Sequence, residues 1–304
     1  MHTSVLITGG SGLLALNWAL AIRDRYAVTL GLHERTVSLP MVKSQQVDLT
    51  SADRFAQTLD AIRPAFVIHT VGLTNVDKCE SEPDLARHIN VGLAANVAKA
   101  CARTGVPLIH ISTDHLFPGH KSLVDENEPT KPINVYGRTK AEAEHRVLEA
   151  HPQSLVIRTN FYGWGPSYRR SFSDTIIDAL RAGKTLTLFD DVFYTPILIE
   201  SAAQAAHDLI DAKAMGIYHV VGDERISKYE FGLALAGRFG LDTGKIRPGS
   251  INDQPQLVTR PREMSLSNQK VRKLLRRQLG DASAHIERLY QQEKTGVVSE
   301  LHRL

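Results

Sequence analysis

Short apolar runs alternate with helical patterns through the first half of this 304-residue chain. Such alternation is typical of right-handed βαβ units, in which helices join parallel strands. Several runs are apolar throughout, as expected for strands covered by helices on both faces. We therefore predict an α/β fold with a doubly wound, Rossmann-type parallel sheet. The predicted strands are Ser4–Thr8, Ala27–Leu32, Gln45–Val47, Ala65–His69, Pro107–Ser112 and Ser154–Arg158, and the predicted helices are Gly12–Asp24, Ser51–Arg63, Asp84–Arg103 and Val135–Glu149.

The alternation loosens after Arg158, and Phe161–Arg170 has the glycine, aromatic and basic composition of a loop. We expect residues 1–160 to form the main domain. Residues 161–304 should form mainly a smaller C-terminal α/β lobe, with residues 196–215 returning to the main domain. In this second region we predict helices over Asp174–Ala182, Glu200–Ala212, Ile226–Phe239 and Asn268–Gln278, and a strand over Gly216–Val221.

The composition is that of a soluble globular protein, with 42% hydrophobic and 23% charged residues. A net charge of +3 from 36 basic and 33 acidic side chains is too balanced to favour a nucleic-acid partner. The two cysteines, Cys79 and Cys101, suit a reducing cytoplasm and offer neither a disulfide framework nor metal-ligand spacing. The apolar run Val5–Ile22 contains three glycines and an asparagine, so we interpret it as a buried strand and helix rather than a membrane or signal segment.

A glycine-rich turn, Thr8–Ala15, joins the first predicted strand to the first predicted helix. Gly9 and Gly12 permit a tight turn and the close approach of a pyrophosphate, which would lie at the helix N-terminus. The position of this turn in the first βαβ unit is the context that a dinucleotide site requires. We predict that Gly9, Ser11, Gly12, Leu13 and Leu14 contact the cofactor, and that residues 1–160 are the dinucleotide-binding domain.

The end of the second strand selects between NAD and NADP, since a carboxylate there binds the ribose hydroxyl and a cation binds a 2′-phosphate. This segment reads His33-Glu34-Arg35, with no aspartate at the strand end itself. Because His33 and Arg35 could hold a phosphate, we predict NADP(H) as the preferred cofactor and leave NAD(H) open. Asp48, followed by Leu49, is a candidate for the adenine end, and a helix N-cap is the alternative interpretation of Asp48.

Tyr136 and Lys140 are four residues apart on a predicted helix, so both side chains lie on one face about one turn apart. A free tyrosine, with a pKa of about 10, exchanges protons poorly at neutral pH. We expect the neighbouring ammonium group to lower the pKa of the phenol and make proton exchange with a substrate oxygen practicable.

Read together, these motifs resemble the extended short-chain dehydrogenase/reductase superfamily and, within it, the dTDP-4-dehydrorhamnose reductase family. Thr74–Glu80 is similar to the T-x-V-D-x-x-E segment, and Ser112–Gly119 to S-T-D-Y-V-F-x-G. Pro132–Lys140 matches P-x-N-x-Y-G-x-x-K, the motif that carries the catalytic pair. Asp191 with Thr195-Pro196 and Arg260-Pro261 resemble later motifs, so the likeness covers nearly the whole chain.

The resemblance implies hydride transfer between a nicotinamide and a carbonyl carbon, with a nucleotide-linked deoxy sugar as substrate. Tyr136 would give its proton to the carbonyl oxygen, Lys140 would hold the nicotinamide ribose and stabilise the phenolate, and Thr113 would bond the same oxygen. Thr70, Val71 and Gly72 would line the cofactor. The substrate residues implied are Thr74, Asp114, His115, Asn160, Phe161 and Arg260, and Arg158, Tyr168, Arg169 and Arg170 are candidates for its pyrophosphate.

Some positions depart from the family pattern. His115 replaces a tyrosine, Asn160–Pro166 offers no clear equivalent of the substrate-stacking tryptophan, and the first helix lacks the glutamate of metal-bridged members. We therefore predict no metal site, and the particular sugar does not carry over. A homodimer stays open, as do two other functions: an NADP-binding regulatory subunit similar to that of methionine adenosyltransferase, and a nucleotide-sugar epimerase. A dehydratase is disfavoured because Asp114-His115 is not the acidic pair usual there.

Overall fold

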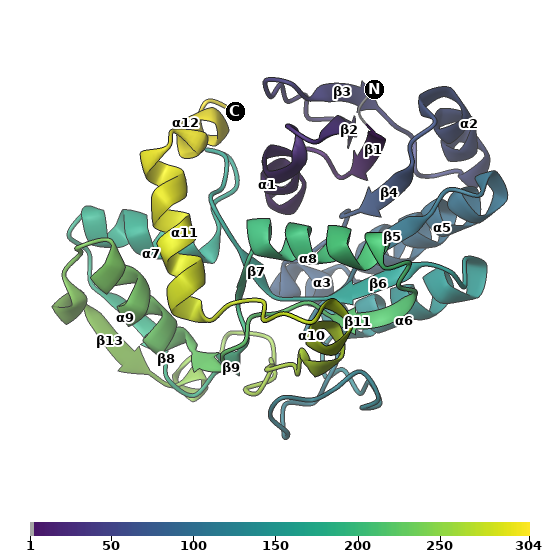
Figure 1. The fold of residues 1–304 in the computed structure, drawn as a ribbon. Helices are drawn as coiled ribbons and strands as arrows, with labels where there is room; N and C mark the ends of the chain where they lie inside the picture. The colour runs from purple at the N-terminus through teal and green to yellow at the C-terminus, as the bar shows by residue number, and fades with distance from the viewer. Residues whose placement is uncertain (1–2) are drawn as a thin grey trace.

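A computed structural model of the chain describes residues 3–304. Seven parallel strands form the central sheet in the order β11-β6-β5-β4-β1-β2-β3 (Figure 1). The order reverses direction at β1, where β4 lies on one side and β2 on the other, so the predicted Rossmann-type α/β fold is confirmed. The strands are β1 (Thr3–Thr8), β2 (Tyr26–Leu32), β3 (Lys43–Gln46), β4 (Phe66–His69), β5 (Leu108–Ile111), β6 (Leu155–Arg158) and β11 (Gly216–His219).

Helices cover both faces of this sheet, as its apolar strands require. On one face α2 (Ala52–Ile62), α5 (Leu93–Thr104) and α6 (Val135–Ala150) pack side by side. On the other face α1 (Leu13–Ile22) packs against α8 (Ile199–Asp211), whose buried alanines 202, 203, 205 and 206 allow close approach.

The chain between β4 and α5 differs from the single helix predicted over Asp84–Arg103. It contains α3 (Val76–Ser81), α4 (Pro83–Arg87) and a π-helical turn, η1 (His88–Gly92), before α5 begins. Pro83 starts α4 because proline suits the first turn of a helix. The wider π turn carries Asn90 into the interior, where its side chain accepts from Leu73 N at 2.7 Å and donates to Thr139 Oγ1 at 2.9 Å.

The C-terminal lobe is built from short strand pairs and helices (Figure 1). Its strands are β7 (Phe161–Tyr162), β8 (Leu186–Phe189), β9 (Phe193–Tyr194), β10 (Ile197–Leu198), β12 (Ile226–Ser227) and β13 (Ile246–Gly249). Its helices are α7 (Phe172–Arg181), α9 (Lys228–Arg238), α11 (Ala282–Lys294) and α12 (Val297–His302), with 3₁₀ turns at Thr243–Lys245 and Ile251–Asp253. By contrast, α10 (Gln269–Leu275) packs against α8 and β11 of the main domain. The segment predicted as a loop thus begins with β7, and the strand predicted over Gly216–Val221 is β11 at the edge of the main sheet, beside β6.

Among residues 3–304, no helix is long and apolar enough to cross a membrane.

Candidate functional site

A cavity of about 990 Å³ lies at the carboxyl ends of β1, β2, β4, β5 and β6. Parallel α/β sheets bind ligands at this edge, beside the point where the strand order reverses. The cavity is lined by most of the residues predicted from the sequence: Gly9, Ser11, Gly12, Leu13, Leu14, His33, Asp48, Leu49, Thr70, Val71, Gly72, Thr74, Thr113, Asp114, His115, Tyr136, Asn160 and Phe161. Arg35, Lys140 and Arg260 do not line it.

The glycine turn forms one wall of the cavity and has the shape that a pyrophosphate needs. Gly9 has a φ of 75°, and a Cβ at this position would lie 2.9 Å from Thr70 Oγ1. The amide of Gly12 donates to the carbonyl of Gly9 at 2.8 Å, which closes the turn. Gly12 is also the N-cap of α1 and supplies no side-chain cap, so the positive end of the helix dipole faces the cavity. These residues fit the diphosphate of a dinucleotide.

The far end of the cavity contains Leu32, His33, Val47, Asp48 and Leu49. Asp48 accepts from the hydroxyl and amide of Thr50 and from Arg54, and these bonds, the Thr50 hydroxyl first, lower the pKa of Asp48 to about 2. The N-cap of α2 is Ser51 instead, so the N-cap interpretation of Asp48 is wrong.

Tyr136 and Thr113 come together in the wall of the cavity, where β5 ends beside α6. Tyr136 is buried and its phenol shares a hydrogen bond with the side chain of Thr113. Burial raises the pKa of Tyr136 well above its usual range, and the Thr113 bond only partly offsets this. The expected lowering of the Tyr136 pKa by Lys140 is therefore wrong: burial outweighs any effect of the ammonium group.

Lys140 lies deeper, under the end of β5. Its ammonium group donates to the carbonyl of Ile111 at 2.7 Å, and its side chain is buried. Burial lowers the pKa of Lys140 to about 8, although the carboxylate of Glu144 opposes this. The cation thus lies behind the wall of the cavity rather than in it.

Residues at the substrate end form a connected polar group. Asp114 accepts from Thr113 at 3.2 Å and from Asn160 Nδ2 at 2.5 Å, which links the ends of β5 and β6. His115 stands edge-on to the Tyr136 ring, with the ring centroids 5.4 Å apart. Arg260 is bonded to Asp77 instead of entering the cavity.

The four residues predicted as candidates for a substrate pyrophosphate differ in where their side chains lie. Arg158 is buried in a bidentate ion pair with Glu144, so the prediction that it contacts a pyrophosphate is wrong. Tyr168 donates to the carbonyl of Ser11 rather than lining the cavity. Arg169 and Arg170 do line it; Arg169 donates to Thr74, whereas Arg170 is bonded to Asp178.

Sequence reasoning missed the wall formed by α4, the π turn and the first residue of α5. Leu85, His88, Ile89 and Leu93 all line the cavity. No sequence signal marks the π turn that brings them there, because the segment has an ordinary helical pattern.

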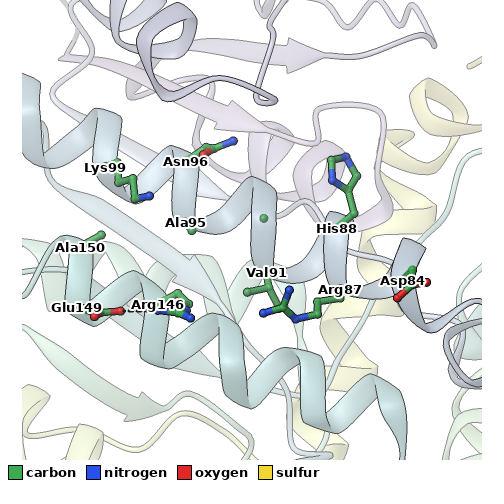
Figure 2. A pocket seen from close by; sticks show the side chains of 11 residues that line it. Asp84, Arg87, His88, Val91, Ala95, Asn96, Lys99, Arg146, Glu149 and Ala150 are labelled. Carbon is green, nitrogen blue, oxygen red and sulfur yellow. Dashed lines mark hydrogen bonds and ion pairs between the residues drawn. The ribbon is translucent and has the colours of Figure 1, made fainter.

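A second hollow, of about 680 Å³, lies on the outer side of α5 and α6 and is lined by residues such as Asn96, Lys99 and Arg146 (Figure 2). Its lining shares only His88 with the first cavity and contains none of the residues predicted to act on a substrate. The candidate site is therefore the cavity at the edge of the sheet.

Comparisons with known proteins agree with this geometry. The family model described as the RmlD substrate binding domain matches residues 2–295. A probable low-salt glycan biosynthesis reductase of Haloferax volcanii is 32% identical over 267 residues, 86% of this chain and 88% of that protein. Methionine adenosyltransferase 2 subunit beta of Mus musculus is 29% identical over 278 residues, 89% of this chain and 82% of that protein.

Among solved structures, dTDP-4-dehydrorhamnose reductase from Bacillus anthracis, in complex with NADP, superposes with a TM-score of 0.85 at 26% identity. The superposition covers 96% of this chain and all of the other, 100%. The predicted resemblance is confirmed: this chain belongs to the RmlD substrate binding domain family, the extended short-chain reductases that include dTDP-4-dehydrorhamnose reductase.

Proposed function

We propose that this protein reduces the keto group of a nucleotide-linked 4-keto-6-deoxy sugar with NADPH, or with NADH at lower efficiency. The observation that carries the proposal is the bonded pair Thr113 and Tyr136, which lines the same cavity as the glycine turn. The relationship to a reductase whose structure contains NADP supports the cofactor. Residues 1–160 would bind the cofactor, and residues 161–304 would form mainly the substrate-binding lobe.

The cofactor, when bound, supplies the hydride that adds to the carbonyl carbon. Tyr136 donates its proton to the carbonyl oxygen, so the ketone becomes an alcohol. The raised pKa of Tyr136 suits this direction, because burial keeps the phenol protonated until the oxygen gains negative charge. Thr113 fixes the oxygen by a hydrogen bond, and its bond to the phenol offsets part of the cost of the phenolate that remains.

A turnover assay with a panel of nucleotide-linked keto sugars tests this proposal. We expect the absorbance of NADPH to fall in proportion to the sugar added and the product to gain two hydrogen atoms by mass spectrometry. Binding of NADPH without turnover of any keto sugar would contradict it. An epimerase would instead convert its sugar with no net consumption of cofactor.

The relationship to a subunit of methionine adenosyltransferase favours one other function, that of a cofactor-binding regulatory subunit. Affinity purification of the protein from its native organism distinguishes a reductase from a regulatory subunit. A regulatory subunit would bring down a catalytic partner in stoichiometric amount and show no reductase activity of its own.

A further inference from the structure

Tyr168 and Arg35 come from distant parts of the chain and stack beside the glycine turn. Arg35 follows β2, whereas Tyr168 lies between β7 and α7. The guanidinium carbon of Arg35 is 3.9 Å from the centroid of the Tyr168 ring. The hydroxyl of the same ring donates to the carbonyl of Ser11 at 2.9 Å. Tyr168 therefore links the turn that fits a pyrophosphate to the cation that follows β2.

The segment that carries Tyr168 is fixed on both sides of the ring. Asn17 of α1 donates to the carbonyl of Trp164 at 2.7 Å, and Arg169 donates to Thr74 at 3.1 Å. Between them Gly165 lies so close to α1 that a Cβ there would be 3.0 Å from Leu13 Cδ1. A ring held in this way offers a fixed platform, so the guanidinium loses little freedom when it binds a ligand.

The donors of Arg35 are available to a ligand. Among residues 3–304, its guanidinium group has no hydrogen-bond acceptor and no carboxylate partner. The adjacent carboxylate, Glu34, is paired with His33 at 3.9 Å. A planar guanidinium presents five N–H donors around its edge, and stacking on a ring occupies only its face. The edge is therefore free to bind a phosphate.

The place of this stack points to one phosphate in particular. Ser11, whose carbonyl Tyr168 contacts, and His33, two residues before Arg35, line the cavity. The stack therefore lies beside the cavity, near the end of β2 where a ribose 2′-substituent is recognised. We infer that Tyr168 is a positioning residue for cofactor selection: by stacking on Arg35, it holds the guanidinium edge toward the 2′-phosphate of NADP(H). The inference rests on the proposed function only in assuming that the cavity binds a nicotinamide dinucleotide.

Calorimetric titration with two fragments tests the inference without any turnover. The probes are 2′,5′-ADP, which carries the 2′-phosphate, and 5′-AMP, which lacks it, and the readout is the ratio of their dissociation constants. We expect wild type to prefer 2′,5′-ADP and Arg35→Ala to lose about tenfold or more of that preference, as befits a charge-assisted phosphate contact. Tyr168→Leu should lose about two- to fivefold, the range of an exposed cation–π contact.

Three further variants separate positioning from a general structural effect. Tyr168→Phe keeps the ring and should keep the preference, although it loses the bond to Ser11. In Arg35→Ala/Tyr168→Leu, the second substitution should cost no further preference, since its effect acts through Arg35. Tyr290→Leu removes a similar stack, with Arg238 at 3.5 Å, away from the cavity and should leave the ratio unchanged.

The inference is wrong if Tyr168→Leu weakens both probes equally, or if wild type binds both equally well. The second result would leave the proposed reductase intact, as an enzyme that uses NAD(H). Failure of wild type to bind either probe or either whole cofactor would instead overturn the proposed function, and this inference with it.

Discussion

Gly137 packs directly against the backbone carbonyl of His115, and a Cβ at position 137 would overlap that oxygen. The glycine beside Tyr136 thus lets α6 approach the end of β5. This approach brings the phenol of Tyr136 to Thr113. The glycine that follows the tyrosine in the sequence is therefore needed for steric reasons.

We predict that Gly137→Ala destabilises the protein by about 1–3 kcal/mol or more, because the overlap is with backbone that cannot turn aside. Gly237→Ala is the matched control, since Gly237 also lies in a helix but has open space around its Cα. Alanine there should raise the free energy of unfolding by up to about 1 kcal/mol. Urea denaturation measures both, and equal effects of the two substitutions would contradict this account.

We predict that Glu144→Ala destabilises the protein by about 3–5 kcal/mol, because it leaves the guanidinium of Arg158 buried and unpaired. The two side chains are only 5% and 4% exposed. The exposed pair of Arg146 and Glu149 provides the comparison, and Glu149→Ala should cost less than about 1 kcal/mol. If thermal and urea unfolding show similar losses of unfolding free energy for Glu144→Ala and Glu149→Ala, the buried pair is not an important stabilising contact.

The stability of the protein should depend on pH through Lys140. The pKa of Lys140 is about 8 in the folded chain against 10.5 for the free side chain, so the unfolded chain binds more protons between these values. The free energy of unfolding should therefore gain a rising contribution from about pH 8 to about pH 10.5. Lys140→Met removes the buried charge and should be more stable than wild type by about 1–3 kcal/mol at neutral pH, with the difference shrinking above pH 8.

Chemical denaturation at several pH values checks this prediction, with Lys99→Met as the control because Lys99 is exposed. The control variant should track wild type at every pH. A difference between Lys140→Met and wild type that stays constant, or widens, as the pH rises would refute the assignment.

The sequence predicted the sheet better than the lobe, and the reason is the range of the pairings. Most strands from β1 to β6 are apolar and alternate with helices, a pattern visible locally, whereas β3 at the sheet edge is polar and exposed. By contrast, β8 pairs with β13 some 60 residues later (Leu186 with Ile246), and no local pattern encodes such a contact. For the same reason, the sequence did not reveal the ion pair of Arg158, whose partner Glu144 comes from a different element. The π turn was also not predicted, because its wider geometry has no signature in the residues.

The proton donor is the centre of this account, and one comparison tests it most directly: NADPH oxidation by wild type and Tyr136→Phe with a nucleotide-linked 4-keto-6-deoxy sugar, alongside calorimetric titration of NADPH into both. We predict that both proteins bind NADPH with similar affinity and that loss of the phenolic proton slows turnover by about 10²–10⁴-fold. Turnover by Tyr136→Phe at the wild-type rate would contradict the account.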